Sequence, residues 1–126
     1  MKKLGPIVKR AKKDKDILGV MVFGSFARGE ARPSSDIDVC LILHPKFSGN
    51  FSKKKLEYLS LADDKVDIHV FQQLPSYVRV RVLRDGKLLL SKDYEKLLSI
   101  FLRTIKEFEL FKKHYYACIK GVAYAR

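Results

Sequence analysis

The stretch over residues 17–43 constrains the fold of this chain more than any other part of it. An apolar run over 17–23 ends in a Gly24-Ser25 pair, and a polar segment then leads to a second apolar run over 36–43. Short apolar runs bounded by turn residues are typical of buried strands. We therefore predict two neighbouring strands, joined by a loop that begins with one helical turn.

Two carboxylates stand at the beginning of the second predicted strand. Side chains alternate between the two faces of a strand, so Asp36 and Asp38 project together while Ile37 and Val39 project to the other face. Neighbouring carboxylates repel each other unless a cation compensates, and oxygen ligands suit Mg²⁺ or Mn²⁺ better than zinc. Because Mg²⁺ completes its coordination with water and phosphate oxygens, the pair predicts a phosphorylated ligand.

The Gly24-Ser25 corner supplies a second part of such a site. Glycine allows close approach of a backbone, and N–H groups at the start of a helical turn bind phosphate oxygens, with a serine hydroxyl beside them. We expect Gly24 and Ser25 to contact the phosphates of a nucleotide. The segment thus combines a phosphate-binding corner with a metal-binding pair of carboxylates.

The spacing of these residues resembles a known signature. Gly24-Ser25, ten further residues and then Asp36-Ile37-Asp38 match the G-S-x₁₀-D-x-D pattern of the DNA polymerase β-like nucleotidyltransferases. The fuller run GSFARGEARPSSDIDV is similar to the minimal nucleotidyltransferases, the small partners of HEPN-domain proteins in toxin–antitoxin pairs. The resemblance implies an α/β (α+β) fold in which a small mixed sheet is flanked by helices, one of them long and C-terminal. We expect a single nucleotidyltransferase domain over residues 1–126.

A third carboxylate lies on the next predicted strand, over residues 66–71. Alternation places Asp67, His69 and Phe71 on one face of it, and taken alone Asp67 is simply a polar residue on a half-exposed strand. The resemblance implies that Asp67 is the family's third acidic residue, which helps to hold the metal or accepts the proton of the attacking hydroxyl. Asp36, Asp38 and Asp67 are therefore the predicted catalytic residues and metal ligands. For His69 we expect a structural hydrogen bond.

The resemblance also implies an activity: transfer of AMP from ATP to a hydroxyl group, with two Mg²⁺ ions or, alternatively, Mn²⁺. The implied partner is a HEPN-domain toxin, whose tyrosine would receive the AMP, so that the chain would act as an antitoxin. Gly24 and Ser25 would bind the nucleotide. Arg28 would neutralise the triphosphate, although an ion pair with Glu30 explains it equally well, and Ser35 is a nucleotide-binding candidate that mainly shapes the loop.

Two other functions keep the same residues. A small-molecule nucleotidyltransferase of the antibiotic-modifying type would use the same carboxylates, and a non-catalytic protein could bind a toxin or RNA through its basic surface. The formal net charge is +12, with 26 Lys and Arg against 14 Asp and Glu. The basic residues are spread along the chain and aromatic residues do not alternate with them, so nucleic-acid binding stays open.

The remaining elements are predicted from periodicity and end signals. Helices are expected over 1–16, over 52–62 with Ser52 as its cap and Leu56, Tyr58 and Leu59 facing inward, and over 93–122. A short strand is expected over 87–91. The alternation over 78–83 favours a strand, whereas the resemblance suggests a helix. The apolar stripe of the last helix exceeds what a small sheet can cover and predicts docking of a partner or a second copy.

Composition agrees with a small globular domain. The chain has 126 residues, 47% hydrophobic and 32% charged, and shows no signal peptide and no apolar run of about 20 residues. We expect a soluble cytoplasmic protein that forms homodimers or hetero-oligomers. The two cysteines, Cys40 and Cys118, match no zinc motif and are expected to be reduced thiols.

Overall fold

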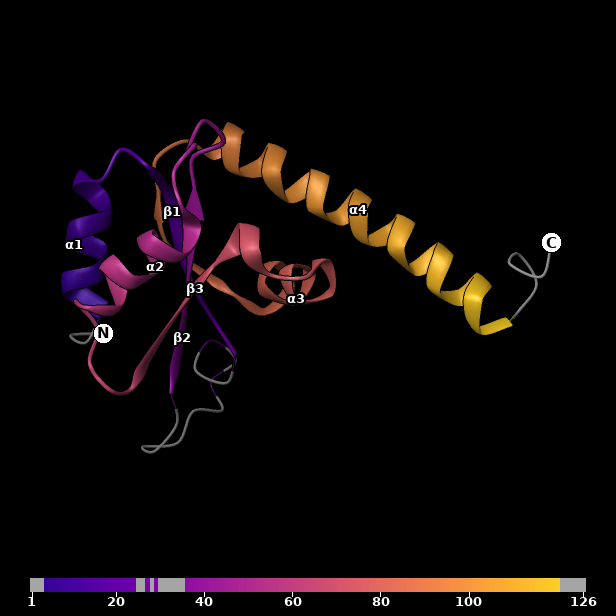
Figure 1. Cartoon of the computed structure of the whole chain (residues 1–126), viewed down its shortest axis with the longest axis horizontal. Helices are drawn as coiled ribbons and strands as arrows, with labels where there is room; N and C mark the ends of the chain where they lie inside the picture. The colour runs from indigo at the N-terminus through magenta and orange to yellow at the C-terminus, as the bar shows by residue number, and fades with distance from the viewer. Residues whose placement is uncertain (1–3, 25–26, 28, 30–35, 121–126) are drawn as a thin grey trace.

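The computed structural model describes residues 4–24, 27, 29 and 36–120, with side chains as far as residue 117. Within this part of the chain, four strands form one sheet, with four α-helices and one 3₁₀ helix around it (Figure 1). In chain order the elements are α1 (Gly5–Lys13), β1 (Ile17–Phe23), β2 (Ile37–Leu43), α2 (Phe51–Leu59), β3 (Val66–Val70), η2 (Phe71–Gln73), α3 (Ser76–Asp85), β4 (Lys87–Ser91) and α4 (Tyr94–Lys120).

The sheet is mixed, with the strand order β3-β2-β1-β4. β1 runs antiparallel to both β2 and β4, whereas β2 and β3 run parallel to each other and are connected through α2. A parallel pair needs such a crossover, and its geometry brings the beginnings of both strands to the same edge of the sheet. The predicted α/β fold with a small mixed sheet is confirmed.

Helices cover both faces of the sheet (Figure 1). α1 and α2 pack on the face that carries Val39, Leu41 and Ile68. α3 and α4 pack on the face that carries Cys40 and Ile42. Strand alternation puts Asp38 on this second face, at the end that the helices leave open.

Three details of the predicted helices were wrong. The cap of α2 is Asn50, whose side chain accepts the backbone N–H of Lys53 at 3.0 Å, and not Ser52. Leu56, expected inside, is 65% exposed, because the helix instead turns Lys54 and Tyr58 towards the core. The first helix is also shorter than expected, since the backbone leaves the helix at Asp14.

The structure decides between the two interpretations of residues 78–83. They belong to α3, so the helix is confirmed and the strand suggested by alternation was wrong. Only Val82 of this helix is fully buried. A short helix with one buried position has no clear 3.6-residue pattern, which is why its Val-Arg alternation resembled a strand.

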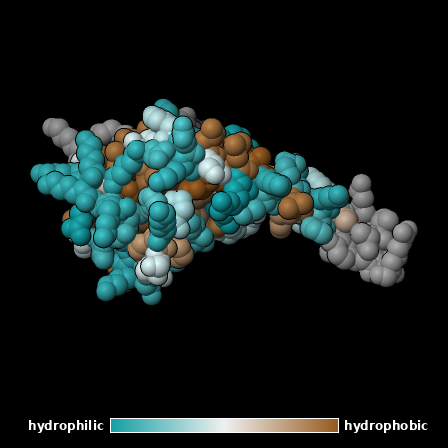
Figure 2. Space-filling view, turned by 90° about the horizontal axis from the view of Figure 1, so that it is seen from above, coloured by the Kyte–Doolittle hydropathy of each residue, from teal (hydrophilic) through white to brown (hydrophobic). Residues whose placement is uncertain are grey.

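α4 begins where predicted, with Asp93 Oδ1 accepting the N–H of Lys96 at 3.2 Å, and then extends away from the sheet (Figure 1). Its first half packs on the body through Leu97 and Thr104. Figure 2 shows the projecting part with hydrophobic residues among hydrophilic ones. Seven large apolar side chains of this helix are 44–58% exposed: Leu98, Leu102, Ile105, Leu110, Phe111, Tyr115 and Tyr116. No helix in the described ranges combines the length and apolar content needed to cross a membrane.

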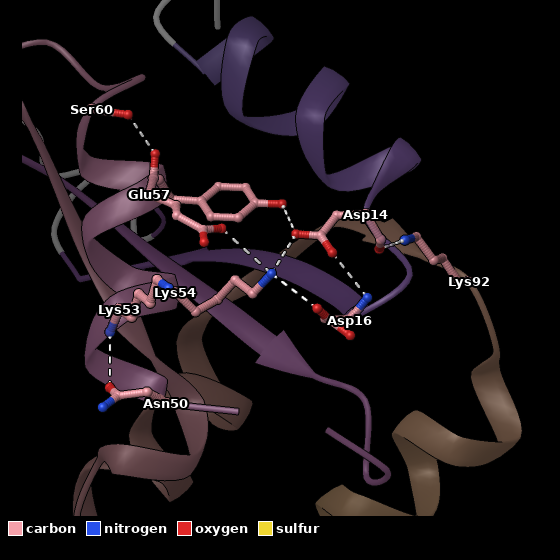
Figure 3. A network of polar contacts seen from close by, with 9 residues as sticks. Asp14, Asp16, Asn50, Lys53, Lys54, Glu57, Ser60 and Lys92 are labelled. Carbon is pink, nitrogen blue, oxygen red and sulfur yellow. Dashed lines mark hydrogen bonds and ion pairs between the residues drawn. The ribbon is translucent and has the colours of Figure 1, made fainter. Parts of the chain in front are cut away.

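A nearly buried lysine joins α2 to the segment that precedes β1 (Figure 3). Lys54 Nζ lies 3.1 Å from Asp14 Oδ2 and 3.1 Å from Asp16 Oδ2, and the Tyr58 hydroxyl donates to Asp14 Oδ2 at 2.8 Å. Burial by itself would raise the pKa of Asp14, but hydrogen bonds from the Asp16 N–H, Tyr58 and Lys54 outweigh it and lower that pKa. Lys54 is thus a structural residue rather than part of a solvent-facing basic run.

Candidate active site

Asp38 and Asp67 lie side by side at the open end of the sheet. β2 and β3 pair in parallel with Asp38 directly opposite Asp67, and alternation points both side chains to the face that α3 and α4 cover further along. The two side chains are 30% and 52% exposed. Both carboxylates are therefore held by sheet register and remain accessible to a ligand from solvent.

His69 lies between these two carboxylates. Its Nε2 atom is 3.0 Å from Asp67 Oδ2 and 3.3 Å from Asp38 Oδ1. Its ring meets the Phe23 ring in a T-shaped arrangement, with 5.2 Å between the ring centroids. The expected hydrogen-bonding contacts of His69 are present, yet its central place was missed, although its spacing of two from Asp67 on one strand was a signal for it.

Gly24 brings the backbone against Asp38. It follows β1 with φ at +76°, a left-handed conformation that favours glycine, and a Cβ atom built on it would lie 2.5 Å from Asp38 Oδ2. The contact follows from the sheet, because the preceding residue, Phe23, is the antiparallel partner of Asp38. The glycine of the signature thus adjoins a carboxylate of the signature.

The other predicted site residues are placed less completely. Asp36 lies just before β2 and is exposed, and it is not part of the cluster formed by Asp38, Asp67 and His69. Ser25, Arg28 and Ser35 fall outside the described residues. The functions assigned to these four residues stay predictions.

The cluster of Asp38, Asp67 and His69 has the donor set of a divalent-metal site. One ligand atom from each side chain lies within 4.8 Å of the other two. Two carboxylates and one imidazole nitrogen suit a divalent cation, and the exposure of the carboxylates leaves room for water and phosphate oxygens to complete its coordination. The residues present therefore fit the Mg²⁺ or Mn²⁺ that the sequence suggests.

A separate hollow lies at the opposite end of the parallel strands. It has a volume of about 220 Å³ and is bounded by residues that follow β2 and β3 and by side chains of α3 and α4, among them His44, Gln72, Arg79 and Arg103. The Gln72 side chain makes two hydrogen bonds to the backbone of Leu43. Its Oε1 atom accepts from the Leu43 N–H at 3.2 Å, and its Nε2 atom donates to the Leu43 carbonyl at 2.8 Å. This hollow is distinct from the carboxylate cluster, which lies where the same strands begin.

Comparison with known proteins places the chain in a family. Residues 6–95 match the family model described as polymerase beta, nucleotidyltransferase. A Methanocaldococcus jannaschii protein with the provisional name protein adenylyltransferase is 30% identical over 79 residues. That match covers 63% of this chain, and the chain spans 60% of the relative's length.

Solved structures share the fold. A chain from a toxin–antitoxin crystal structure with AMP-PNP superposes with a TM-score of 0.69 at 19% identity, over 91% of this chain and 94% of that one. A chain from the Shewanella oneidensis complex of a tri-AMPylated HEPN toxin with an MNT antitoxin has a TM-score of 0.64 at 18% identity, over 97% and 98% of the two chains. A Sulfolobus solfataricus protein provisionally named as a nucleotidyltransferase has a TM-score of 0.52 at 25% identity, over 68% and 75%.

The family model covers well over half of the chain, from α1 to the start of α4, and includes Gly24 and the strands that carry Asp38 and Asp67. The chain therefore belongs to the polymerase β nucleotidyltransferase family.

Proposed function

We propose that this nucleotidyltransferase transfers AMP from ATP to a tyrosine hydroxyl of a HEPN-family toxin and thereby acts as its antitoxin. The observation that carries the proposal is the in-register pair of Asp38 and Asp67, with Gly24 packed against Asp38. These residues unite the phosphate-binding and carboxylate parts of the signature in one place. The site is also open, so a side chain of another protein can reach it.

The residues of the site divide the chemistry among them. Asp38 and Asp67, with Asp36 from the residue before β2, would hold Mg²⁺ or Mn²⁺, which when bound neutralises the triphosphate and stabilises the attacking and leaving oxygens. Gly24 lets the phosphates approach the backbone closely, with Ser25 beside it and Arg28 and Ser35 further along the loop. Asp67, the more exposed carboxylate, accepts the proton of the attacking hydroxyl.

A protein acceptor is favoured by the surface as well as by the comparisons. The Methanocaldococcus relative is named for adenylyl transfer to protein, and two of the structures with the same fold come from toxin–antitoxin complexes. The apolar side chains exposed along α4 are of the kind that a protein partner covers. Transfer to an antibiotic-like alcohol by the same carboxylates is the alternative to be tested.

The test is to incubate the protein with ATP, Mg²⁺ and the product of the neighbouring gene, and to weigh both proteins by mass spectrometry. We expect the partner to gain the mass of one or more AMP groups. Asp38→Asn and Asp67→Asn should each slow the transfer by at least about 10²-fold, because each leaves the charge of the triphosphate less well compensated.

Asp64→Asn is the matched control, since Asp64 is an exposed aspartate three residues before Asp67. It should transfer AMP at the wild-type rate. Full transfer by Asp38→Asn would contradict the proposed site. If label from ATP appears on a small alcohol and never on the partner protein, the small-molecule alternative replaces the proposal.

A further inference from the structure

We propose that His69 is an additional, nitrogen ligand of the catalytic cation and makes this site prefer Mn²⁺ to Mg²⁺. The inference rests on the proposed function, because it assumes that Asp38 and Asp67 bind a divalent ion. It adds a residue that the G-S-x₁₀-D-x-D signature does not contain. The evidence is the place of the imidazole relative to the two carboxylates.

The distances around His69 Nε2 are those of hydrogen-bonded or ion-paired groups, and they also match the spacing of donors that share an ion. In octahedral coordination with bonds of about 2.1 Å, two adjacent donor atoms lie about 3 Å apart. Nε2 lies 3.0 Å from Asp67 Oδ2 and 3.3 Å from Asp38 Oδ1. One potential ligand atom from each of the three side chains lies within 4.8 Å of the other two. An ion bound by the Asp38 and Asp67 oxygens that face His69 could therefore also be coordinated by Nε2 after small side-chain shifts.

The surroundings of the ring keep it in this place. Phe23 contacts it edge-on, with 62° between the ring planes. The residue directly opposite His69 on β2 is the fully buried Cys40. The half-buried imidazole thus stands at the border of the core, beside the carboxylates.

The donor set determines the preference between ions. Mg²⁺ is bound almost entirely by oxygen. Mn²⁺ also favours oxygen ligands but, as a first-row transition ion, accepts an imidazole nitrogen more readily than Mg²⁺ does. A site of two carboxylates and one imidazole therefore gains affinity for Mn²⁺ from its nitrogen and little affinity for Mg²⁺. Mn²⁺ also accepts the octahedral, oxygen-rich coordination that water and phosphates supply.

The competing role for His69 is that of a spacer, which donates a hydrogen bond between two carboxylates in the absence of metal and moves aside when an ion binds. A spacer would affect how strongly any divalent ion binds but would leave no nitrogen on the ion. Direct detection of the ligand nitrogen therefore separates the two roles without any measurement of catalysis.

The experiment is pulsed electron paramagnetic resonance of Mn²⁺ bound to the full chain, with tripolyphosphate in place of ATP and in a buffer that contains no nitrogen. Tripolyphosphate has no nitrogen atom, so a strong ¹⁴N coupling on Mn²⁺ can come only from the protein. We expect that coupling in the wild type and its loss in His69→Gln. His44→Gln is the control, since His44 is another half-buried histidine but lies at the opposite end of β2, and it should retain the coupling.

A second measurement uses Mg²⁺ to displace the bound Mn²⁺. In His69→Gln we expect the Mg²⁺ concentration that displaces half of the Mn²⁺ to fall about tenfold, the lower end of the effects seen when the ligand environment of a metal site is altered. His69→Asn should behave in the same way, and thermal unfolding of both variants verifies that they are folded.

The outcomes separate the two proposals. If wild-type protein binds Mn²⁺ but shows no ¹⁴N coupling, or if His69→Gln keeps the wild-type preference, the ligand role of His69 is refuted while the proposed function stands. If the wild type binds neither Mn²⁺ nor Mg²⁺ with tripolyphosphate and transfers no AMP, the proposed function itself fails.

Discussion

Replacing Gly24 with alanine tests whether the glycine of the signature is needed because Asp38 lies against it. Gly24 and Gly29 both have a left-handed backbone, with φ at +76° and +74°. A Cβ atom at Gly24 would meet Asp38 Oδ2 at 2.5 Å, whereas a Cβ atom at Gly29 meets nothing within 4 Å. Gly29→Ala therefore reproduces the backbone strain of Gly24→Ala without its collision.

The backbone strain and the collision with Asp38 have different expected effects. An alanine in a left-handed conformation costs roughly 1–2 kcal/mol at either position, or about 4–8 °C in melting temperature for a chain of this length. At Gly24 the new Cβ is about 0.9 Å short of ordinary contact, so the Asp38 carboxylate must move by a similar distance. Displacing a catalytic group by about 1 Å reduces the rate by roughly 10²-fold.

The assay compares AMP transfer and thermal unfolding of the wild type, Gly24→Ala and Gly29→Ala under the same conditions. We expect similar losses of melting temperature in both variants but a loss of transfer, by about 10²-fold, only in Gly24→Ala. Equal transfer by the two variants would refute the reasoning, because it would mean that the Asp38 carboxylate does not need the position that Gly24 allows.

Further predictions concern the interior. Lys54→Met should lower the free energy of unfolding by about 3 kcal/mol, and the melting temperature by about 10 °C, because it leaves the buried Asp14 carboxylate without its cation; urea and thermal unfolding measure both. The pKa of Asp14 is below its ordinary value of 3.8 in the fold, so its contribution exists above that pH and is lost as the pH falls through the folded pKa. The deficit of Lys54→Met should therefore shrink in acid, and a pH-independent deficit would show that only packing was lost. Tyr58→Phe should cost about 1–2 kcal/mol, because it removes the 2.8 Å hydrogen bond to Asp14, whereas Leu56→Gln should change stability by less than about 0.5 kcal/mol. In a Cys118→Ser background, Cys40 should react with a maleimide only when the protein unfolds, since it is fully buried and burial raises the pKa of its thiol.

Local sequence was sufficient to predict the elements that consist of an apolar strand or carry a long apolar stripe. The strands over 17–23 and 87–91 and the beginning of the last helix followed from runs of apolar residues and from the Asp93 cap. Short elements with a single buried position were harder to predict. α3 buries only Val82, so its alternating sequence carried no helical period, and only packing on the sheet determines its state.

In the candidate site, too, some features followed from local sequence and others depend on tertiary contacts. Alternation put Asp38 on one face of its strand and Asp67 on one face of the next strand, and the resemblance implied that the two carboxylates meet. Periodicity does not say that the two strands are neighbours, or that they are parallel in the observed register. The position of His69 between the carboxylates, and the approach of Gly24 to Asp38, depend on contacts between strands. Lys54 was likewise counted among the basic residues, because its three acidic partners come from other parts of the chain or from one helical turn away.

Residue types and their spacing were enough to predict the chemistry of this protein: a glycine-serine corner and an Asp-x-Asp pair at a set spacing, each beside an apolar strand. Those features are local, since strand alternation and turn preferences act over a few residues. Which of those groups meet depends on the tertiary structure. Parallel pairing of β2 with β3 brought Asp38, Asp67 and His69 together, because strand register, and not distance along the chain, determines which side chains share an edge of the sheet.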